Sequence, residues 1–282
     1  MKAGRNKAPE FPPIAGRRIS ALSVITLSFL GLFVAMVVSL LVTGLRYEYL
    51  TFEVFKEIIL RPDVLNAVTL SITSSLITLV IVVIFAVPVG YALSRYRFPG
   101  HAIIDTITDI PILLPPVVIG LLLLIFFAYT PGKQIEDLIE WLTGSTMHSM
   151  IGIVAAQFMV SISYAIRSAK TAFDSVDRRL EQVAMSLGCT DIQAFRRVTL
   201  PLAKNGLIAG SIMAWARAIG AFGALVIFVG TARSVRVMPT TIYLELGIGR
   251  EEISIAVGLV MVVIASVALA TIHWVAPGRK WH

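Results

Sequence analysis

The segment that organises this sequence is residues 171–201, which read TAFDSVDRRLEQVAMSLGCTDIQAFRRVTLP. It is rich in polar and charged residues, whereas long apolar runs lie on both sides of it. Its first half carries apolar residues at the i, i+3, i+4, i+7 spacing of a short amphipathic helix. These residues are Leu180, Val183, Ala184 and Leu187. Gly188 can end that helix, because glycine adopts the left-handed cap conformation without steric cost.

The second half of the segment predicts another helix, which starts at Asp191. Thr190 or Asp191 can cap its N-terminus. One face of it would consist of Phe195, Val198 and Thr199. Pro201 would then redirect the chain into the next apolar run. We expect a helix-turn-helix on the inner face of a membrane, with a solvated loop or a purely anchoring interfacial helix as the alternatives.

The composition predicts a membrane protein. Of the 282 residues, 57% are hydrophobic and 15% are charged, with a mean hydropathy of +0.85, whereas a soluble domain carries about 25% charged residues. The net charge of +7 would suggest nucleic acid in a soluble protein. Here the basic residues follow the positive-inside rule, so no nucleic-acid partner is expected. One cysteine and four scattered histidines lack metal-ligand spacing, and we expect no metal and no other cofactor.

Apolar runs predict an all-α fold with six transmembrane helices. They occupy residues 21–43, 65–94, 102–129, 148–170, 202–231 and 252–276. If both termini are cytoplasmic, the inner segments and their edges hold 16 Lys and Arg residues against 7 outside, and Arg217 lies within a span. We therefore expect a basic cytoplasmic tail at 1–20 and one transmembrane domain at 21–282 in the cell membrane.

Two predicted spans carry residues that suit a transport pathway. The second contains a group of hydroxyl residues, Thr69, Ser71, Thr73, Ser74, Ser75 and Thr78. Such hydroxyls either hydrogen-bond neighbouring helices or line a polar cavity. The third contains Pro115 and Pro116, which kink or break a helix, and broken helices either border pathways or serve packing alone. Ser74, Pro115 and Pro116 are accordingly candidate pathway residues.

Residues 180–201 resemble the EAA loop of ABC importer permeases. The matching positions are Leu180, Glu181, Ala184, Leu187, Gly188, Val198, Leu200 and Pro201. The strict Glu-Ala-Ala triplet is replaced by Gln182-Val183-Ala184, but the spacing from Gly188 to Pro201 is that of the family. The similarity continues in order over residues 65–276, including Pro88–Arg95 and Leu114–Gly120. It implies the six-helix fold of type I importers, with residues 171–201 as the coupling loop.

The same resemblance implies the partners. The sequence has no Gly-x-x-x-x-Gly-Lys-Ser/Thr motif, so ATP hydrolysis is expected in a separate cytoplasmic ATPase dimer and this chain is not expected to be an enzyme. Two permease copies, preferably a homodimer, would face that ATPase and accept substrate from an external binding protein. The implied ATPase-coupling residues are Glu181, Ala184, Gly188, Arg196, Arg197, Leu200 and Pro201. Membrane lipid headgroups are the alternative partners of the two arginines.

Residues 215–243 resemble the molybdate, tungstate and sulfate permeases, except that Ala221 stands where those usually carry an acidic residue. Arg217 lies 16 residues beyond Pro201, about 24 Å along a helix. A charge in the membrane is costly, so Arg217 either lowers the barrier for a doubly charged oxyanion or pairs with another group. The resemblance thus implies an oxyanion importer, with Arg217 as a further candidate pathway residue.

Other functions remain open alternatives at this point. A permease for phosphate or an amino acid would share the same machinery. An ATP-independent channel or secondary transporter would need no helix-turn-helix with fixed Gly-to-Pro spacing. A membrane enzyme would need paired acid and base groups, for which Asp105 and Asp109 are the candidates near a span; they are more simply the charges of a helix entrance.

Overall fold

The computed structural model describes residues 28–36, 38–39, 42 and 51–275. The chain divides into two compact units at the boundary between Glu48 and Tyr49. In the first unit, the described residues are helical. The predicted tail at 1–20 and much of the predicted span at 21–43 lie outside the described residues, as does the C-terminal end from 276. All that follows concerns the second unit.

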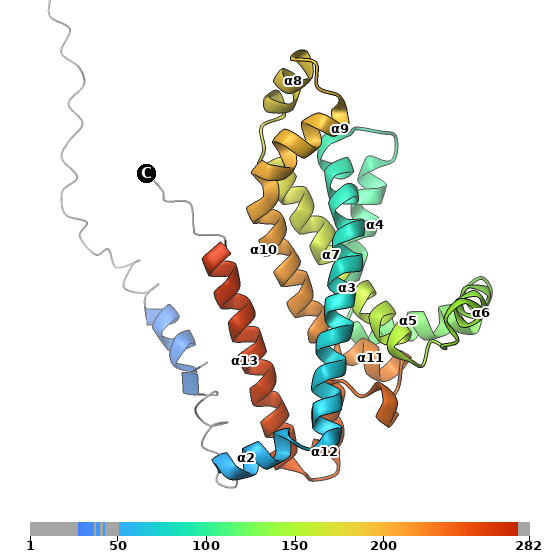
Figure 1. Cartoon of the computed structure of the whole chain (residues 1–282), viewed down its shortest axis with the longest axis vertical. Helices are drawn as coiled ribbons and strands as arrows, with labels where there is room; N and C mark the ends of the chain where they lie inside the picture. The colour runs from blue at the N-terminus through green and yellow to red at the C-terminus, as the bar shows by residue number, and fades with distance from the viewer. Residues whose placement is uncertain (1–27, 37, 40–41, 43–50, 276–282) are drawn as a thin grey trace, which may run out of the picture. The chain divides into compact units, whose positions relative to one another are not determined.

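Every regular element in the described part of the second unit is a helix (Figure 1). The α-helices are α2 (Phe52–Ile59), α3 (Pro62–Arg95), α4 (His101–Leu113), α5 (Pro116–Ala128), α6 (Gly132–Thr143), α7 (Met150–Asp174), α8 (Arg178–Ser186), α9 (Asp191–Ala194), α10 (Leu200–Ile219), α11 (Phe222–Phe228), α12 (Met238–Gly247) and α13 (Glu251–Val275). Two short helices of other types are η1 (Phe195–Thr199), a π-helix, and η2 (Arg233–Val235), a 3₁₀-helix. The predicted all-α fold is confirmed.

Three of the described helices, α3, α7 and α13, are long and apolar enough to cross a membrane. Two bent combinations, α4 with α5 and residues 191–219 with α11, would raise the number to five if each were one span. These five correspond to the predicted spans from residue 65 onward. The predicted count of six is not confirmed, because much of the first predicted span falls outside the described residues.

The predicted third span, 102–129, is not a single rod. Helices α4 and α5 meet at an angle of 111°, which makes this region a broken span or a re-entrant loop. Leu114 and Pro115 both adopt extended backbone, with ψ of 134° and 138°. Each precedes a proline, and the ring of the following proline disfavours the α conformation. Of the two predicted outcomes, a kink or a break, the two consecutive prolines therefore produce the break. The run at 202–231 also bends, by 47°, between α10 and α11.

Helix α7 is the most buried of the three long helices. Half of its most apolar window is buried, against 28% for α3 and for α13. Small residues allow its neighbours to approach closely: a Cβ atom added at Gly90 of α3 would lie 2.7 Å from the Cβ of Ala169. Close backbone packing of this kind stabilises helix pairs in membranes, where apolar burial contributes little. Helices α3, α7 and α10 therefore form the helical core next to the coupling loop, residues 171–201.

The hydroxyl residues of α3 divide between two faces. Ser71, Ser74, Ser75 and Thr78 follow i, i+3, i+4, i+7 spacing and are buried. Ser75 accepts a hydrogen bond from the indole Nε1 of Trp215 at 2.9 Å, and Thr78 donates to Gln157 at 3.0 Å. On this face these two hydroxyls hydrogen-bond neighbouring helices, which is the first of the two predicted roles. Ser74 is fully buried and donates to the Ser71 carbonyl at 3.3 Å, so it lines no open surface in this structure.

The acidic pair on α4 is neutralised by α7. Lys170 Nζ contacts both carboxylate oxygens of Asp105 at 2.7 Å, and Arg167 pairs with Asp109. Each carboxylate thus faces a cation on the neighbouring helix rather than a base or nucleophile. The two carboxylates therefore serve as structural charges that pair α4 with α7. Their positions give no support to the membrane-enzyme alternative.

Candidate coupling site

Helix α8 is defined at both ends by local hydrogen bonds. The side chain of Asp177 caps its N-terminus by accepting from the Arg179 amide at 2.9 Å. At its C-terminus Gly188 adopts φ of +92°, and the amides of Gly188 and Cys189 donate to the carbonyls of Met185 and Ala184 at 2.9 and 3.1 Å. This is the Schellman pattern, which glycine permits because it has no Cβ. The predicted helix and its glycine cap are confirmed.

The second helix of the loop starts where the sequence predicts. Thr190 and Gln193 form a capping box, in which each side chain accepts from the backbone amide of the other, at 3.4 and 3.0 Å. Such a box satisfies two of the free amides at a helix start. Helix α9 therefore begins at Asp191, as expected.

The prediction that Pro201 redirects the chain is wrong. Helices α9, η1 and α10 follow one another without interruption. Within η1 the turn is wide, with the Leu200 amide donating to the carbonyl of Phe195. Proline removes one donor and clashes with the carbonyl four residues earlier, and it is tolerated in the first turn of α10. We attribute the π-turn to this constraint, since it lets the coupling loop and the next span form one continuous helical rod.

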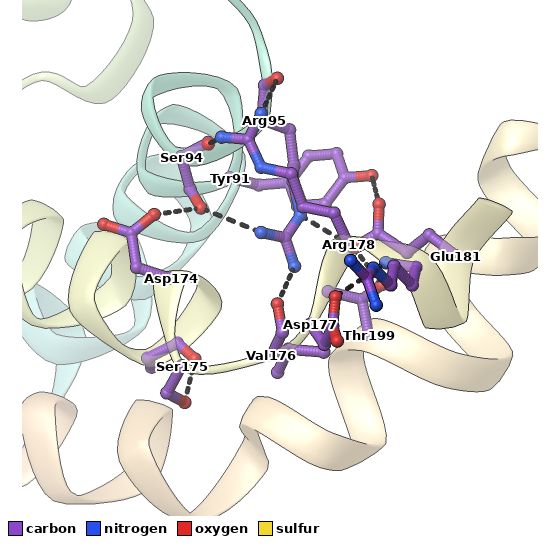
Figure 2. Close-up of polar contacts among 12 residues, drawn as sticks. Tyr91, Ser94, Arg95, Asp174, Ser175, Val176, Asp177, Arg178, Glu181 and Thr199 are labelled. Carbon is purple, nitrogen blue, oxygen red and sulfur yellow. Dashed lines mark hydrogen bonds and ion pairs between the residues drawn. The ribbon is translucent and has the colours of Figure 1, made fainter.

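Glu181 points into the protein and joins three elements (Figure 2). Its Oε1 accepts hydrogen bonds from Arg95 Nε at 2.7 Å and from Thr199 Oγ1 at 2.6 Å. Its Oε2 lies 3.4 Å from the hydroxyl of Tyr91. The side chains of Arg95 and Glu181 are only 6% and 10% exposed. One carboxylate thus ties α8 to the end of α3 and to η1 at the base of α10.

Further polar contacts close the same cluster around the C-terminus of α3 (Figure 2). Arg95 Nη2 donates to the Val176 carbonyl at 3.0 Å, and Ser94 donates to Asp174 at 2.6 Å. The guanidinium of Arg178 donates to the carbonyls of Ser94 and Arg95. The last carbonyls of a helix have no partner within it. Arg178 satisfies two of them, so the end of α3 and the start of α8 are held together.

The buried ion pair specifies geometry more than it adds stability. Removing two charges from water costs several kcal/mol per ion, and the attraction between them offsets much of that cost. Loss of one partner is different, because it leaves an uncompensated buried charge at a cost of about 3–5 kcal/mol. We conclude that Arg95 and Glu181 fix where α8 sits relative to α3.

An aromatic cluster supports the polar one. The ring of Phe195 lies 4.6 Å from Tyr91 and 6.0 Å from Phe173, measured between centroids. Phe195 is partly buried and Thr199 is fully buried. The face predicted for the second loop helix is thus turned inward, and these rings pack it against α3 and α7.

The apolar stripe of α8 faces away from the rest of the chain. Leu180, Val183 and Leu187 are 47%, 57% and 82% exposed, and nearby Ile192 is 71% exposed. Exposed apolar groups that gather in one place mark interaction surfaces. We name these four residues the α8 apolar face. Arg196 and Arg197 are exposed as well, which leaves both free to contact a partner protein or lipid.

The remaining predicted coupling residues take different positions. Ala184 and Leu200 are half-buried, whereas Gly188 and Pro201 are exposed. Glu181, which the resemblance implied as an ATPase-coupling residue, is buried and has three partners within this chain. Sequence reasoning missed Tyr91, Arg95, Arg178 and Thr199. The only signal for Arg95 was a basic residue at the end of a span, since its partner Glu181 lies 86 positions away.

The candidate pathway residues do not form one cluster. Pro115 is exposed and Pro116 half-buried at the break between α4 and α5, and Ser74 is buried. The Arg217 guanidinium lies 5.5 Å from the centroid of the Tyr164 ring, a cation–π geometry, and its buried Nε has no hydrogen-bond partner. No described hydrogen bond or ion pair joins these four residues. Within the described residues no group of three His, Cys, Asp or Glu side chains could hold a metal ion.

Comparison with known proteins gives a consistent result. Residues 84–281 match the family described as "Binding-protein-dependent transport system inner membrane component". A probable molybdenum ABC transporter permease protein of Haloferax volcanii is 39% identical over 210 residues, covering 74% of this chain and 75% of that protein. The molybdenum transport system permease protein of Escherichia coli K12 is 32% identical over 213 residues, covering 75% and 93%.

Solved structures agree on the fold. A bacterial alginate ABC transporter, crystallised with its alginate-bound periplasmic protein, has a TM-score of 0.74 at 17% identity and covers 92% of this chain and 94% of its own. The helical bundle thus has the fold found in that ABC transporter. The chain belongs to the binding-protein-dependent transport system inner membrane component family, and it is a multi-pass membrane permease subunit of an ABC transporter.

Proposed function

We propose that this chain forms the membrane pathway of an importer for a tetrahedral oxyanion of the molybdate and tungstate type, and that α8 couples the pathway to a separate ATPase. The observation that carries the coupling role is the combination of an exposed α8 apolar face with a buried Glu181 anchor. A helix with an exposed apolar surface can bind a partner protein. Because α8 is also fixed to the rest of the chain, a movement of that partner would move the helices to which α8 is attached.

The route of that displacement follows the contacts of Glu181. Movement of α8 acts on α3 through Arg95 and on the continuous rod from α9 to α10 through Thr199. Both helices are long and packed against α7, so they move as bodies rather than bend. ATPase closure would then switch the spans between inward-open and outward-open arrangements by rigid-body motion.

The partners follow from the same proposal. A cytoplasmic ATPase dimer docks on the α8 apolar face, a second copy of this chain completes the pathway, and an external binding protein delivers the anion. The termini and residues 171–201 lie on the cytoplasmic side, as the distribution of Lys and Arg supports. Arg196 and Arg197 contact the ATPase or the anionic lipid headgroups around it.

The substrate class is supported by the relatives. Those from Haloferax volcanii and Escherichia coli are named for molybdenum transport, and a molybdate/tungstate permease protein of Thermococcus kodakarensis is 32% identical over 219 residues. Sulfate is the second candidate, because a sulfate transport system permease protein of Salmonella typhimurium is 27% identical over 219 residues. All these anions are tetrahedral and doubly charged, so the binding protein is the stage at which they are told apart.

Uptake into sealed vesicles tests this proposal. Vesicles with this chain, its ATPase and its binding protein should accumulate labelled molybdate or tungstate only with ATP. Gly188→Ala should reduce uptake, because a Cβ at φ of +92° costs about 1–2 kcal/mol and frays the end of α8. The control Gly258→Ala adds the same methyl group where the structure is open and should leave uptake unchanged. ATP-independent uptake would contradict the importer, and ATP-driven uptake of phosphate or an amino acid instead would contradict the substrate.

A further inference from the structure

A second polar pocket lies at the opposite end of α3 from the coupling site. Its volume is about 300 Å³, and it lies between α3 and the segment around η2. The polar residues that line it are Asn66, Thr69, Thr73, Arg233, Ser234 and Arg236. From Thr73 to Arg95 the helix runs for about 33 Å. In the proposed orientation this pocket therefore lies toward the outer side of the membrane, where an imported anion arrives.

The α3 side of the pocket is a face that packing does not use. Asn66, Thr69 and Thr73 follow i, i+3, i+7 spacing and are exposed. The buried hydroxyl residues of α3 lie on its other face. Thr73 donates its proton to the Thr69 carbonyl at 2.7 Å. Within the described residues the side chains of Asn66 and Thr69 make no hydrogen bond, so both have donors free for a ligand.

The η2 side of the pocket supplies positive charge. Arg233 is exposed and, among the residues that the structure describes, has no hydrogen-bond or ion-pair partner. Arg236 is held in place, because its Nε donates to the Thr231 carbonyl at 3.1 Å. Its Nη1 is 3.9 Å from Glu245, which also faces Arg250 at 3.6 Å. One carboxylate is shared by two arginines, and no carboxylate lines the pocket itself.

We propose that this pocket binds a divalent tetrahedral oxyanion as it enters the pathway, an inference that rests on the function proposed above. Arg233 supplies the main charge, since a guanidinium presents several donors in a geometry that matches oxyanions. Arg236 is the second, positioned donor, and Asn66 and Thr69 complete the contacts. The negative charge of Glu245 partly offsets the positive charge of Arg236, which keeps the affinity of the pocket for the anion low. A site on a transport route must release its ligand as well as bind it.

The test compares transport with ATP hydrolysis in the complete complex. Arg233→Gln should lower tungstate uptake at sub-saturating concentrations about tenfold, the effect of one charge-assisted hydrogen bond. ATP hydrolysis stimulated by the loaded binding protein should persist, because the coupling site is untouched. Arg233→Lys should recover part of the uptake by retaining the charge. Lys56→Gln, a matched loss of an exposed positive charge on α2 outside the pocket, should behave as the unaltered protein.

Each alternative outcome has a distinct meaning. Unchanged uptake in Arg233→Gln would overturn the anion site and leave the proposed function intact. Equal loss of uptake and of stimulated ATP hydrolysis would instead assign Arg233 to docking of the binding protein, which also overturns it. If the unaltered complex took up no oxyanion at all, the proposed function itself would fail, and the inference with it.

Discussion

At the scale of single residues, Glu181 decides how the coupling loop is attached. Its carboxylate, on α8, accepts hydrogen bonds from Arg95 of α3 and from Thr199 of η1. The resemblance to the EAA loop implied Glu181 only as an ATPase-coupling residue. No local pattern could show that Arg95, 86 residues earlier, occupies the same buried site.

Replacing Glu181 should loosen α8 without unfolding the spans. In Glu181→Ala the buried Arg95 loses its partner, so the free energy of local opening of α8 should fall by about 3 kcal/mol. Amide hydrogen exchange in detergent would measure this as faster exchange confined to residues 178–188. Adding Arg95→Met removes the orphaned charge and should restore part of the protection. Exchange in α8 that stays as slow as in the unaltered protein would refute the anchoring role.

At the scale of elements, the sequence predicted helices well wherever local chemistry sets them. The apolar spacing and Gly188 predicted α8, and Thr190 with Asp191 predicted the start of α9. Proline was harder to interpret, because its effect depends on position. Two successive prolines produced a 111° break where the sequence predicted either a kink or a break. Pro201 did not redirect the chain, because proline is tolerated in the first turn of α10.

The α8 apolar face carries a prediction at this scale. Leu187 is 82% exposed, so Leu187→Ser should leave the fold unchanged. Burial of a leucine side chain at an interface contributes about 1.5–3 kcal/mol, and its loss should weaken binding of the ATPase roughly 10- to 100-fold. Titration of the detergent-purified chain with its ATPase measures this.

The matched control is Leu142→Ser on α6. Leu142 is 65% exposed but lies outside the coupling loop, so the affinity for the ATPase should not change. A similar affinity for both variants and the unaltered chain would remove α8 from the interface.

At the scale of the whole molecule, the positions of the spans were more predictable than the site. Five of the six predicted spans correspond to helices or bent pairs in the described residues, because hydropathy alone determines them. The partition of hydroxyl groups on α3 was not predictable. Ser71 and Thr73 look alike in sequence, yet one is buried and the other lines a pocket, and only the positions of neighbouring helices separate them.

The two ends of α3 connect the proposed coupling site with the proposed anion site. One end is fixed to the coupling loop through Arg95, and the other borders the arginine-lined pocket. A single helix with both features can move the anion site when the loop moves. We propose that the ATPase binds at the α8 apolar face.

Cysteine crosslinking within the assembled complex tests that claim most directly. Cys189 is the only cysteine of the chain, so Cys189→Ser gives a clean background for Leu187→Cys and, as a control, Trp141→Cys, which is 79% exposed on α6. A short thiol-to-amine crosslinker should join the ATPase to the chain carrying Leu187→Cys and leave the Trp141→Cys chain unlinked. An ATPase that stays unlinked at Leu187, or that links equally at both positions, would contradict the account.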